Sequence, residues 1–123
     1  METRLMNMKI CGCIAMLVLL GACASKDNML YHWGSYPDQV YEGFQIESGN
    51  TSPDKQLQKL QEEQQKAASK GKALPPGFRA HMGFLYFQTG QTNQAAMAFE
   101  DEKKHFPESA TYMDFALNQL RKP

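Results

Sequence analysis

The first apolar stretch of the chain runs from Ile10 to Leu20 and follows the basic residues Arg4 and Lys9. A basic head followed by a short apolar run and small residues is typical of a secretory signal peptide. The run has 11 residues, whereas a helix needs roughly 20 apolar residues to cross a bilayer. The pattern therefore predicts an export signal that is removed, rather than a membrane span.

The residues that end this run sharpen the prediction. Leu20-Gly21-Ala22-Cys23 resembles the lipobox of bacterial lipoproteins. In those proteins the cysteine is lipidated through its sulfur and becomes the first residue of the mature chain. The resemblance implies that residues 1–22 are a lipoprotein signal peptide and that Cys23 binds the protein to a membrane. Ala24 and Ser25 follow in place of an aspartate, which in such lipoproteins favours the outer membrane.

Beyond the polar tether of residues 23–30, apolar positions begin to recur at helical spacing. Pro37 can open a helix, because its missing N–H would have no partner in a first turn. A short helix over residues 37–46 is therefore expected. Its apolar face would consist of Val40, Tyr41 and Phe44.

A longer amphipathic helix is expected next. Thr51 or Ser52 would cap it, Pro53 would lie in its first turn, and Gly71 would end it. Glu62 and Lys66 are spaced to support it as an ion pair. The apolar stripe would consist of Leu57, Leu60, Gln64, Ala67 and Ala68. The remaining surface would carry Gln56, Gln58, Gln61, Glu62, Glu63, Gln65 and Lys66.

Three further helices are predicted in the C-terminal half. Asn93 and Ser109 are candidate caps, and Gly90 and Pro107 are candidate ends. The expected extents are about residues 78–89, 94–105 and 109–121. No segment alternates apolar and polar residues as a strand does. The sequence therefore predicts an all-α fold of antiparallel helix pairs over residues 31–123, joined by short loops.

The third and fourth expected helices share a spacing pattern. It consists of Gly83, Tyr86, Gly90, Ala95, Phe99 and Pro107. This resembles a tetratricopeptide repeat, in which small residues let two helices approach and aromatic residues fill the space between them. Arg79 and Glu102 depart from the repeat, which has a large aromatic and a small residue at those places. The last helix would cap such a unit.

Charge and length limit the partners. The chain has 13 basic and 13 acidic residues. Removing residues 1–22 takes away Glu2, Arg4 and Lys9 and leaves 101 residues, of which 11 are basic and 12 acidic. This length suits one domain. The near-neutral balance gives no reason to expect nucleic acid or a strongly anionic surface as a partner.

Catalysis has little support. Cys11 and Cys13 lie in the export segment and are removed with it. The acidic run 100–102 is most simply a solvated helix face. Ordinary structural roles are expected for the widely spaced His32, His81 and His105. The sequence has no phosphate-binding loop, nucleophile elbow or zinc-ligand spacing. We therefore expect no enzyme activity, cofactor, metal or small-molecule substrate.

The aromatic stretch 31–44 has two interpretations. Trp33, Tyr36, Tyr41 and Phe44 either pack on the helical core as an N-terminal cap or form a partner-binding surface, since exposed Trp and Tyr are favoured anchors. A second candidate surface is the inner face of the helix pair. Its side chains would be Arg79, Tyr86, Gln88 and Asn93. The sequence leaves both interpretations open.

Two longer segments carry a family resemblance. They are the opening Tyr31-His32-Trp33-Gly34-Ser35-Tyr36 and the run from Leu74 to Gly83 that leads to Phe106-Pro107-Glu108-Ser109-Ala110. With the lipobox, they make the chain similar to the small bacterial lipoproteins of domain-of-unknown-function family 4810. The resemblance implies an exported helical lipoprotein, encoded beside another small lipoprotein and one resembling the curli secretion lipoprotein. It supplies no catalytic residue.

These observations lead to one expected function and one alternative. The expected function is a non-enzymatic interaction module, bound to the outer membrane through the lipid on Cys23. Its partner would be another envelope protein, within an assembly resembling curli secretion. The alternative is a structural lipoprotein that supports envelope integrity without a dedicated partner.

Overall fold

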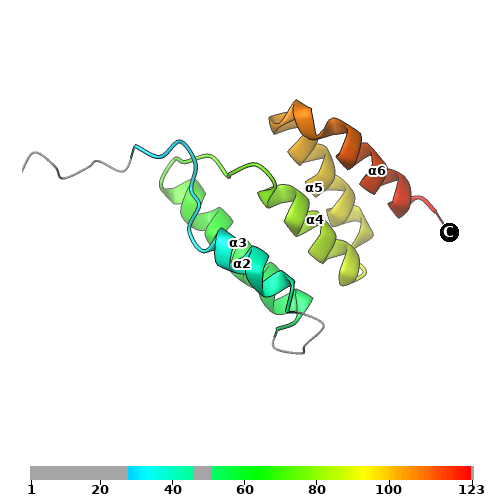
Figure 1. The fold of residues 1–123 in the computed structure, drawn as a ribbon, viewed down its shortest axis with the longest axis horizontal. Coiled ribbons are helices and arrows are strands. Elements are labelled where there is room, and N and C mark those ends of the chain that lie inside the picture. Colours follow the sequence, from blue (N-terminus) through cyan, green and yellow to red (C-terminus); the bar gives the residue numbers. More distant parts are fainter. Residues whose placement is uncertain (1–27, 46–50, 123) are drawn as a thin grey trace, which may run out of the picture.

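The computed structural model describes residues 28–45 and 51–122 (Figure 1). Its elements are α2 (Tyr36–Gly43), α3 (Pro53–Ser69), α4 (Phe78–Gln88), α5 (Thr92–His105), the 3-10 turn η3 (Pro107–Ser109) and α6 (Ala110–Leu120). The described part is all-α, which confirms the expected fold class. No helix within it is long and apolar enough to cross a membrane. The expected signal peptide, Cys23 and residues 24–27 lie outside the described residues.

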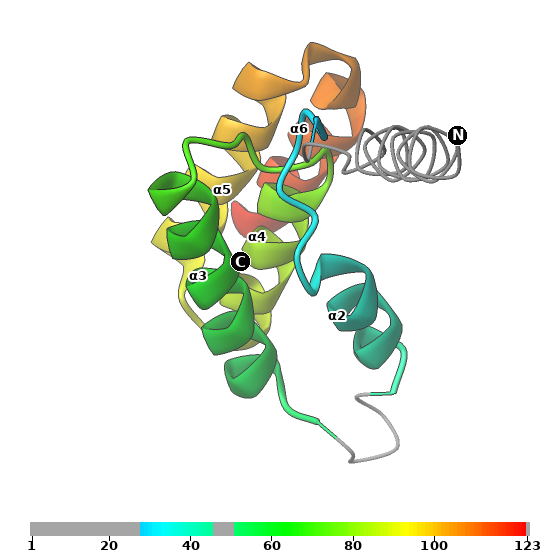
Figure 2. The same ribbon diagram turned by 90° about the vertical axis from the view of Figure 1, so that its left-hand side faces the viewer.

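Each helix packs on the one that follows it in the chain. The packed pairs are α2 with α3, α3 with α4, α4 with α5, and α5 with α6. Short turns join α4 to α5 and α5 to α6, so these neighbours are antiparallel (Figure 1). Turning the molecule shows α2 and α4 toward one side and α3 and α5 toward the other (Figure 2). One face of the domain is therefore built from the first members of successive helix pairs.

The helix boundaries mostly follow local signals in the sequence. Ser52 caps α3 as expected, because its Oγ accepts a hydrogen bond of 3.4 Å from the backbone N–H of Lys55. Asn93 was expected to cap α5, but the helix begins at Thr92 and places Asn93 inside its first turn. The residue before α6, Ser109, donates its hydroxyl to the carbonyl of Phe106 at 2.7 Å and does not cap the helix.

A close contact between two helices is set by a glycine. A Cβ added to Gly83 of α4 would lie 2.5 Å from Cε1 of Phe99 in α5. Phe99 is fully buried and also packs against Phe84, with ring centroids 5.0 Å apart. The missing side chain of Gly83 therefore lets the Phe99 ring lie directly on the α4 backbone.

Helix α4 belongs to two hydrophobic cores. The first core consists of Tyr36, Leu57, Leu60, Ala67, Leu74, Phe78, Met82 and Leu85. The second core consists of Ala80, Ala95, Phe99, Met113, Ala116 and Leu117. Tyr86, on α4, packs against both cores, and its hydroxyl accepts a hydrogen bond of 3.1 Å from Nε2 of Gln61. α4 thus joins the N-terminal helices to the C-terminal ones.

The expected polar face of α3 is partly wrong. Gln56 and Glu63 are buried, whereas Gln64, assigned to the apolar stripe, is exposed together with Ala68. The nitrogen of the buried amide has a partner, since Nε2 of Gln56 donates to the carbonyl of Gln39 in α2 at 3.2 Å, whereas its Oε1 accepts no hydrogen bond. A narrow stripe fails here because α3 packs against both α2 and α4. The ion pair was expected between Glu62 and Lys66, but Nζ of Lys66 lies 2.8 Å from Oε1 of Glu63.

The expectation that the acidic run 100–102 forms a solvated face is wrong for Glu102, which is buried. Its carboxylate accepts hydrogen bonds from the backbone N–H groups of Gly77, at 2.6 Å, and Ala80, at 3.4 Å. These groups begin α4, where Gly77 has no side chain to cap them. A carboxylate is favoured at the positive end of a helix. The departure from the repeat pattern at this position therefore provides α4 with its N-terminal cap.

The segment before α2 is fixed to the helices by several contacts. Nε2 of His32 lies 2.7 Å from Oε2 of Glu63, and both residues are buried. The backbone N–H of His32 donates to the carbonyl of Ala73 at 2.8 Å, beside an isolated bridge between Tyr31 and Ala73. The Tyr31 ring also meets Phe106 edge-on, with centroids 6.0 Å apart. Residues 31–35 therefore form a strap across the helical domain.

Candidate functional site

The structure divides the aromatic stretch 31–44 between core and surface. Tyr36 is 8% exposed and packs against Phe78, with ring centroids 5.0 Å apart. Tyr41 and Phe44 are 66% and 80% exposed, so the interpretation that they cap the core is wrong. Gln39 takes the buried position on α2 instead.

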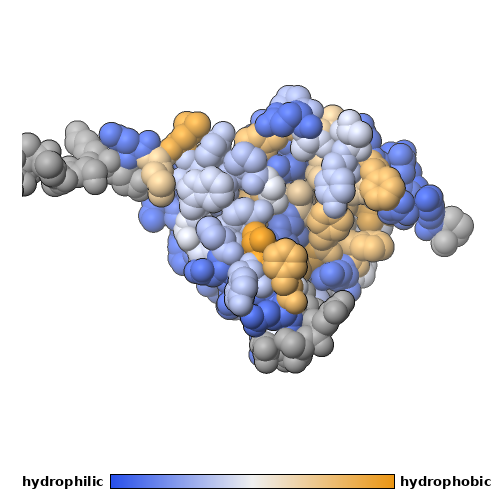
Figure 3. Space-filling model, in the orientation of Figure 1, coloured by the Kyte–Doolittle hydropathy of each residue, from blue (hydrophilic) through white to orange (hydrophobic). Residues whose placement is uncertain are grey.

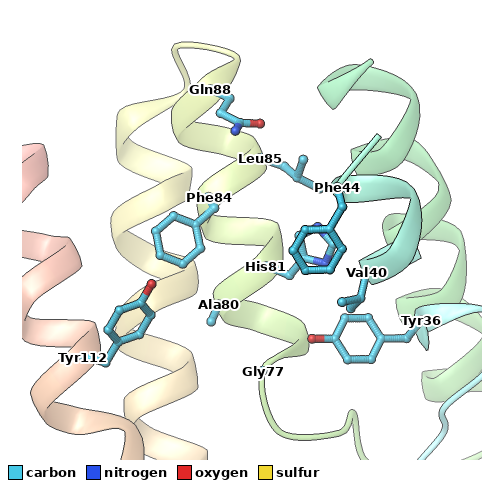
Figure 4. A pocket seen from close by; sticks show the side chains of 11 residues that line it. Tyr36, Val40, Phe44, Gly77, Ala80, His81, Phe84, Leu85, Gln88 and Tyr112 are labelled. Atoms are coloured by element: carbon cyan, nitrogen blue, oxygen red, sulfur yellow. The ribbon is translucent and has the colours of Figure 1, made fainter. Parts of the chain in front are cut away.

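A groove lies on the face built by the first helices of the pairs. Its volume is about 520 Å³. Its lining comprises Tyr36, Val40, Gly43, Phe44, Gly77, Ala80, His81, Phe84, Leu85, Gln88 and Tyr112. Figure 4 shows the α2 wall, with Tyr36, Val40 and the following Phe44, on one side and Tyr112 of α6 on the other. Helix α4 lies between them and contributes Phe84. We call this cavity the α2–α4–α6 groove.

The described residues that line the groove include no Asp, Glu, Lys or Arg. Burial lowers the pKa of His81, so its imidazole is neutral at pH 7. Burial, and secondly the Glu102 carboxylate, raise the pKa of Tyr36 to about 12, so its hydroxyl stays protonated. The groove therefore presents rings, aliphatic groups and a few uncharged hydrogen-bonding groups.

A smaller apolar pocket continues the groove between α4 and α6. It encloses about 140 Å³ and shares Phe84 and Tyr112 with the groove. The two shared rings lie 6.0 Å apart and form the ridge between the hollows. Beyond this ridge, Phe87 and Phe115 line the pocket and are themselves exposed. Figure 3 shows the resulting apolar area on this face of the molecule.

The comparisons with known proteins give one match. The family model described as a domain of unknown function, DUF4810, matches residues 30–116. The chain belongs to the DUF4810 family. No curated protein and no solved structure matches the chain. The matched DUF4810 region contains all described lining residues of the α2–α4–α6 groove, including Tyr112.

The sequence-based candidates lie at three separate places in the DUF4810 domain. Tyr36 lines the groove, and Trp33 stacks on it with ring centroids 6.4 Å apart. Tyr41 is exposed on α2 and is not among the groove residues. Arg79 and Tyr86 line a separate crevice of about 200 Å³ on the side of α3 and α5. The structure thus brings Trp33 and Tyr36 together but separates them from Arg79 and Tyr86.

Phe84 and Tyr112 are the groove residues with a six-membered aromatic ring that the sequence did not indicate. Phe84 is four residues after Ala80 and packs against the second core, whereas Met82 and Leu85 belong to the first. A second apolar face on α4 was therefore a usable signal in the DUF4810 sequence. Tyr112 offered none, because its contact with Phe84 depends on how α6 folds back.

The three histidines lie in different surroundings in the DUF4810 domain. His32 pairs with Glu63, His81 lines the groove, and Nδ1 of His105 lies 2.8 Å from the carbonyl of Asp101. Within residues 28–45 and 51–122, no group of three or more His, Cys, Asp or Glu side chains is placed to hold a metal ion. The groove is therefore the most distinctive site that the described residues offer.

Proposed function

We propose that this protein is a non-enzymatic interaction module, lipid-anchored through Cys23 at the periplasmic face of the outer membrane. Its α2–α4–α6 groove holds an apolar, uncharged segment of another envelope protein. The observation that carries the proposal is the uncharged aromatic groove itself, which is open to solvent on one face of the domain.

The chemistry of the lining selects the occupant. A charged side chain entering the groove would lose water without meeting an opposite charge, and this desolvation is costly. Apolar side chains would instead cover Phe44, Phe84 and Tyr112, of which Phe44 and Tyr112 are largely exposed in the free domain. Burying apolar surface contributes roughly 25 cal/mol per Å². The groove therefore favours an uncharged peptide segment rich in aliphatic or aromatic residues.

The likeness of α4 and α5 to a tetratricopeptide repeat belongs to the same proposal. It is supported by the direct packing of Phe99 on Gly83 and by the antiparallel arrangement of the two helices. In this interpretation α2, α4 and α6 are the first helices of successive repeat-like pairs. Such units stack so that these helices share one surface, and solenoids use that surface for binding.

The proposed anchor rests on the lipobox resemblance at Leu20-Gly21-Ala22-Cys23. Several acyl chains hold a protein stably at a bilayer, whereas one alone binds marginally. A lipoprotein with several chains would keep the groove permanently near other envelope components. The variant Cys23→Ala is expected to lose membrane retention or processing, which fractionation of cells would reveal.

Site-specific crosslinking in cells tests the groove. A photoreactive amino acid replaces Phe44 in the full chain, and a matched chain carries it in place of Met97. Both residues are exposed, at 80% and 70%, so neither replacement should disturb packing. Met97 is on α5 and lines the separate crevice of Arg79 and Tyr86 instead of the groove, so it tests the second candidate surface.

The expected result is one discrete adduct from position 44 and none from position 97. Mass spectrometry should locate the adduct in an uncharged apolar segment of an envelope protein. The same low background at both positions would contradict the proposal and favour a structural role without a dedicated partner. A crosslink to a charged segment would contradict the proposed chemistry of the occupant.

A further inference from the structure

The N-terminal end of the described chain exposes large apolar side chains outside the groove. Met29 is 57% exposed, Leu30 is 74% exposed, and Trp33 is 39% exposed. None of the three lines the α2–α4–α6 groove or the smaller pocket beside it. These residues, which we call the N-terminal apolar edge, are therefore not explained by the proposed partner site.

The position of this edge in the chain limits what can cover it. If Cys23 carries the lipid, Met29 is six residues from the anchor, which is at most about 20 Å of extended chain. The edge is therefore held within a few residues' length of the bilayer surface.

The edge is also attached rigidly to the domain. Tyr31 and His32, between Leu30 and Trp33, are fixed to Ala73 and Glu63 by the strap contacts. Trp33 itself stacks on Tyr36, whose ring is part of the first core. A membrane surface that holds the edge would therefore also fix the orientation of the whole domain.

We propose that the N-terminal apolar edge inserts into the phospholipid surface and fixes the orientation of the domain on the membrane. This inference rests on the proposed lipid anchor at Cys23. Tryptophan is favoured at membrane interfaces because its ring is largely apolar and its N–H is polar. Met29 and Leu30 supply aliphatic surface, whose burial among acyl chains is favourable.

The orientation has a consequence for the groove. Residues 28–33 lie at the left of Figure 1, whereas the groove lies on the face toward the viewer, where Figure 3 shows the apolar area. A bilayer that meets the edge from the left would leave the groove uncovered. The groove would then open along the membrane plane, toward other proteins held at the same surface.

The fluorescence of Trp33 provides a direct test, because it is the only tryptophan of the chain. The mature protein, which begins at the lipidated Cys23, is reconstituted in vesicles of phosphatidylethanolamine and phosphatidylglycerol. A second preparation carries bromine on the acyl chains, which quenches nearby tryptophan. We expect loss of Trp33 emission in the brominated vesicles and a blue shift of the emission in both preparations.

Two variants define the controls. Combined Met29→Asp and Leu30→Asp substitutions should abolish the quenching, while the protein still floats with the vesicles. Met97→Asp, at an equally exposed apolar residue on α5, should leave the quenching unchanged. Quenching that persists in the double variant would contradict the role of the aliphatic residues.

Flotation of the vesicles separates the two possible failures. Protein that floats with the vesicles but shows no quenching would overturn the insertion of the edge and leave the proposed anchor standing. Protein that does not float would overturn the anchor at Cys23, and the insertion of the edge would fall with it.

Discussion

At the scale of single residues, the contact between Gly83 and Phe99 can be tested by adding one methyl group. Gly→Ala inside a helix normally stabilises by about 0.5–1 kcal/mol. In Gly83→Ala the new Cβ would lie 2.5 Å from Cε1 of the buried Phe99 ring. We therefore expect the opposite sign, with a loss of about 1–3 kcal/mol in the free energy of unfolding. Urea unfolding followed by circular dichroism would measure it.

Gly43, in α2, supplies a matched control for this substitution. A Cβ there would meet the side chains of Gln56 and His81 at 3.8 Å, which is ordinary contact. Because Gly43 is the last residue of α2, Gly43→Ala should give a small gain in stability and none of the loss expected for Gly83→Ala. If both variants gained stability equally, α4 and α5 would not be packed as closely as the structure indicates.

A second prediction at the residue scale concerns Tyr36 at alkaline pH. Burial, and secondly Glu102, raise the pKa of Tyr36 from 10.0 to about 12. The folded state therefore favours the protonated phenol, so this contribution to stability is present below pH 10 and is lost as pH rises toward about 12. Over this range the parent protein should lose at most about 2.7 kcal/mol in its free energy of unfolding. Tyr36→Phe cannot ionise at this position and should not show that loss.

The measurement compares unfolding free energies of the parent protein and Tyr36→Phe below pH 10 and near pH 12. Other groups that titrate there, such as Lys66 and Lys103, are common to both proteins and cancel in the comparison. Tyr112→Phe is the control, because Tyr112 is largely exposed. An equal decline in the unfolding free energy of the parent protein and of Tyr36→Phe would contradict the raised pKa of Tyr36.

At the scale of elements, the strap depends on Gly34. Its φ is +46°, a left-handed conformation that favours glycine, and an added Cβ would overlap the Glu63 carboxylate. Burial raises the pKa of Glu63, but hydrogen bonds from Lys66 and His32 outweigh this and lower it overall, so the carboxylate is charged at neutral pH. We therefore expect Gly34→Ala to break the pair between Glu63 and His32 and to release the strap.

Limited proteolysis and hydrogen exchange of residues 28–35 would detect this release, with α4 to α6 remaining protected. Gly71→Ala is the matched control, since Gly71 also has a positive φ, +61°, but no atom within 4 Å of an added Cβ. Backbone strain alone would affect both variants. If the strap stayed protected in Gly34→Ala, the overlap with Glu63 would not exist.

The same elements show what the sequence could and could not predict. Ser52, Pro53 and Gly71 act within a turn of the helix ends they define, so the extent of α3 followed from local signals. Its buried polar residues did not, because Glu63 meets His32 across 31 positions of sequence. Glu102 likewise meets Gly77 across 25 positions. Charge normally indicates exposure, and only the folded chain shows these compensating partners.

At the scale of the whole molecule, the groove could not be predicted for a similar reason. Its walls come from α2, α4 and α6, and no periodicity within one helix indicates which others will face it. The aromatic residues of the stretch 31–44 suggested two roles, and the structure assigns Tyr36 to the core and Phe44 to the surface. The shape of the site thus depends on the relative placement of the two cores.

That placement depends on Tyr86, the residue that packs against both cores. Removing its ring in Tyr86→Ala should cost about 3–5 kcal/mol, by analogy with other large aromatic residues, and should weaken the coupling between the cores. Trp33 fluorescence follows the first core through Tyr36, whereas circular dichroism follows all helices. In the parent protein both urea transitions should coincide. In Tyr86→Ala they should separate.

The control is Tyr86→Phe, which keeps the ring between the two cores and loses only the hydroxyl that accepts from Gln61. It should cost about 0.5–1.5 kcal/mol, the net value of one hydrogen bond, and keep the transitions coincident. If the transitions also coincided in Tyr86→Ala, α4 alone would hold the cores together. If they separate as expected, one side chain couples the α2 wall of the groove to the wall formed by Phe84 and Tyr112.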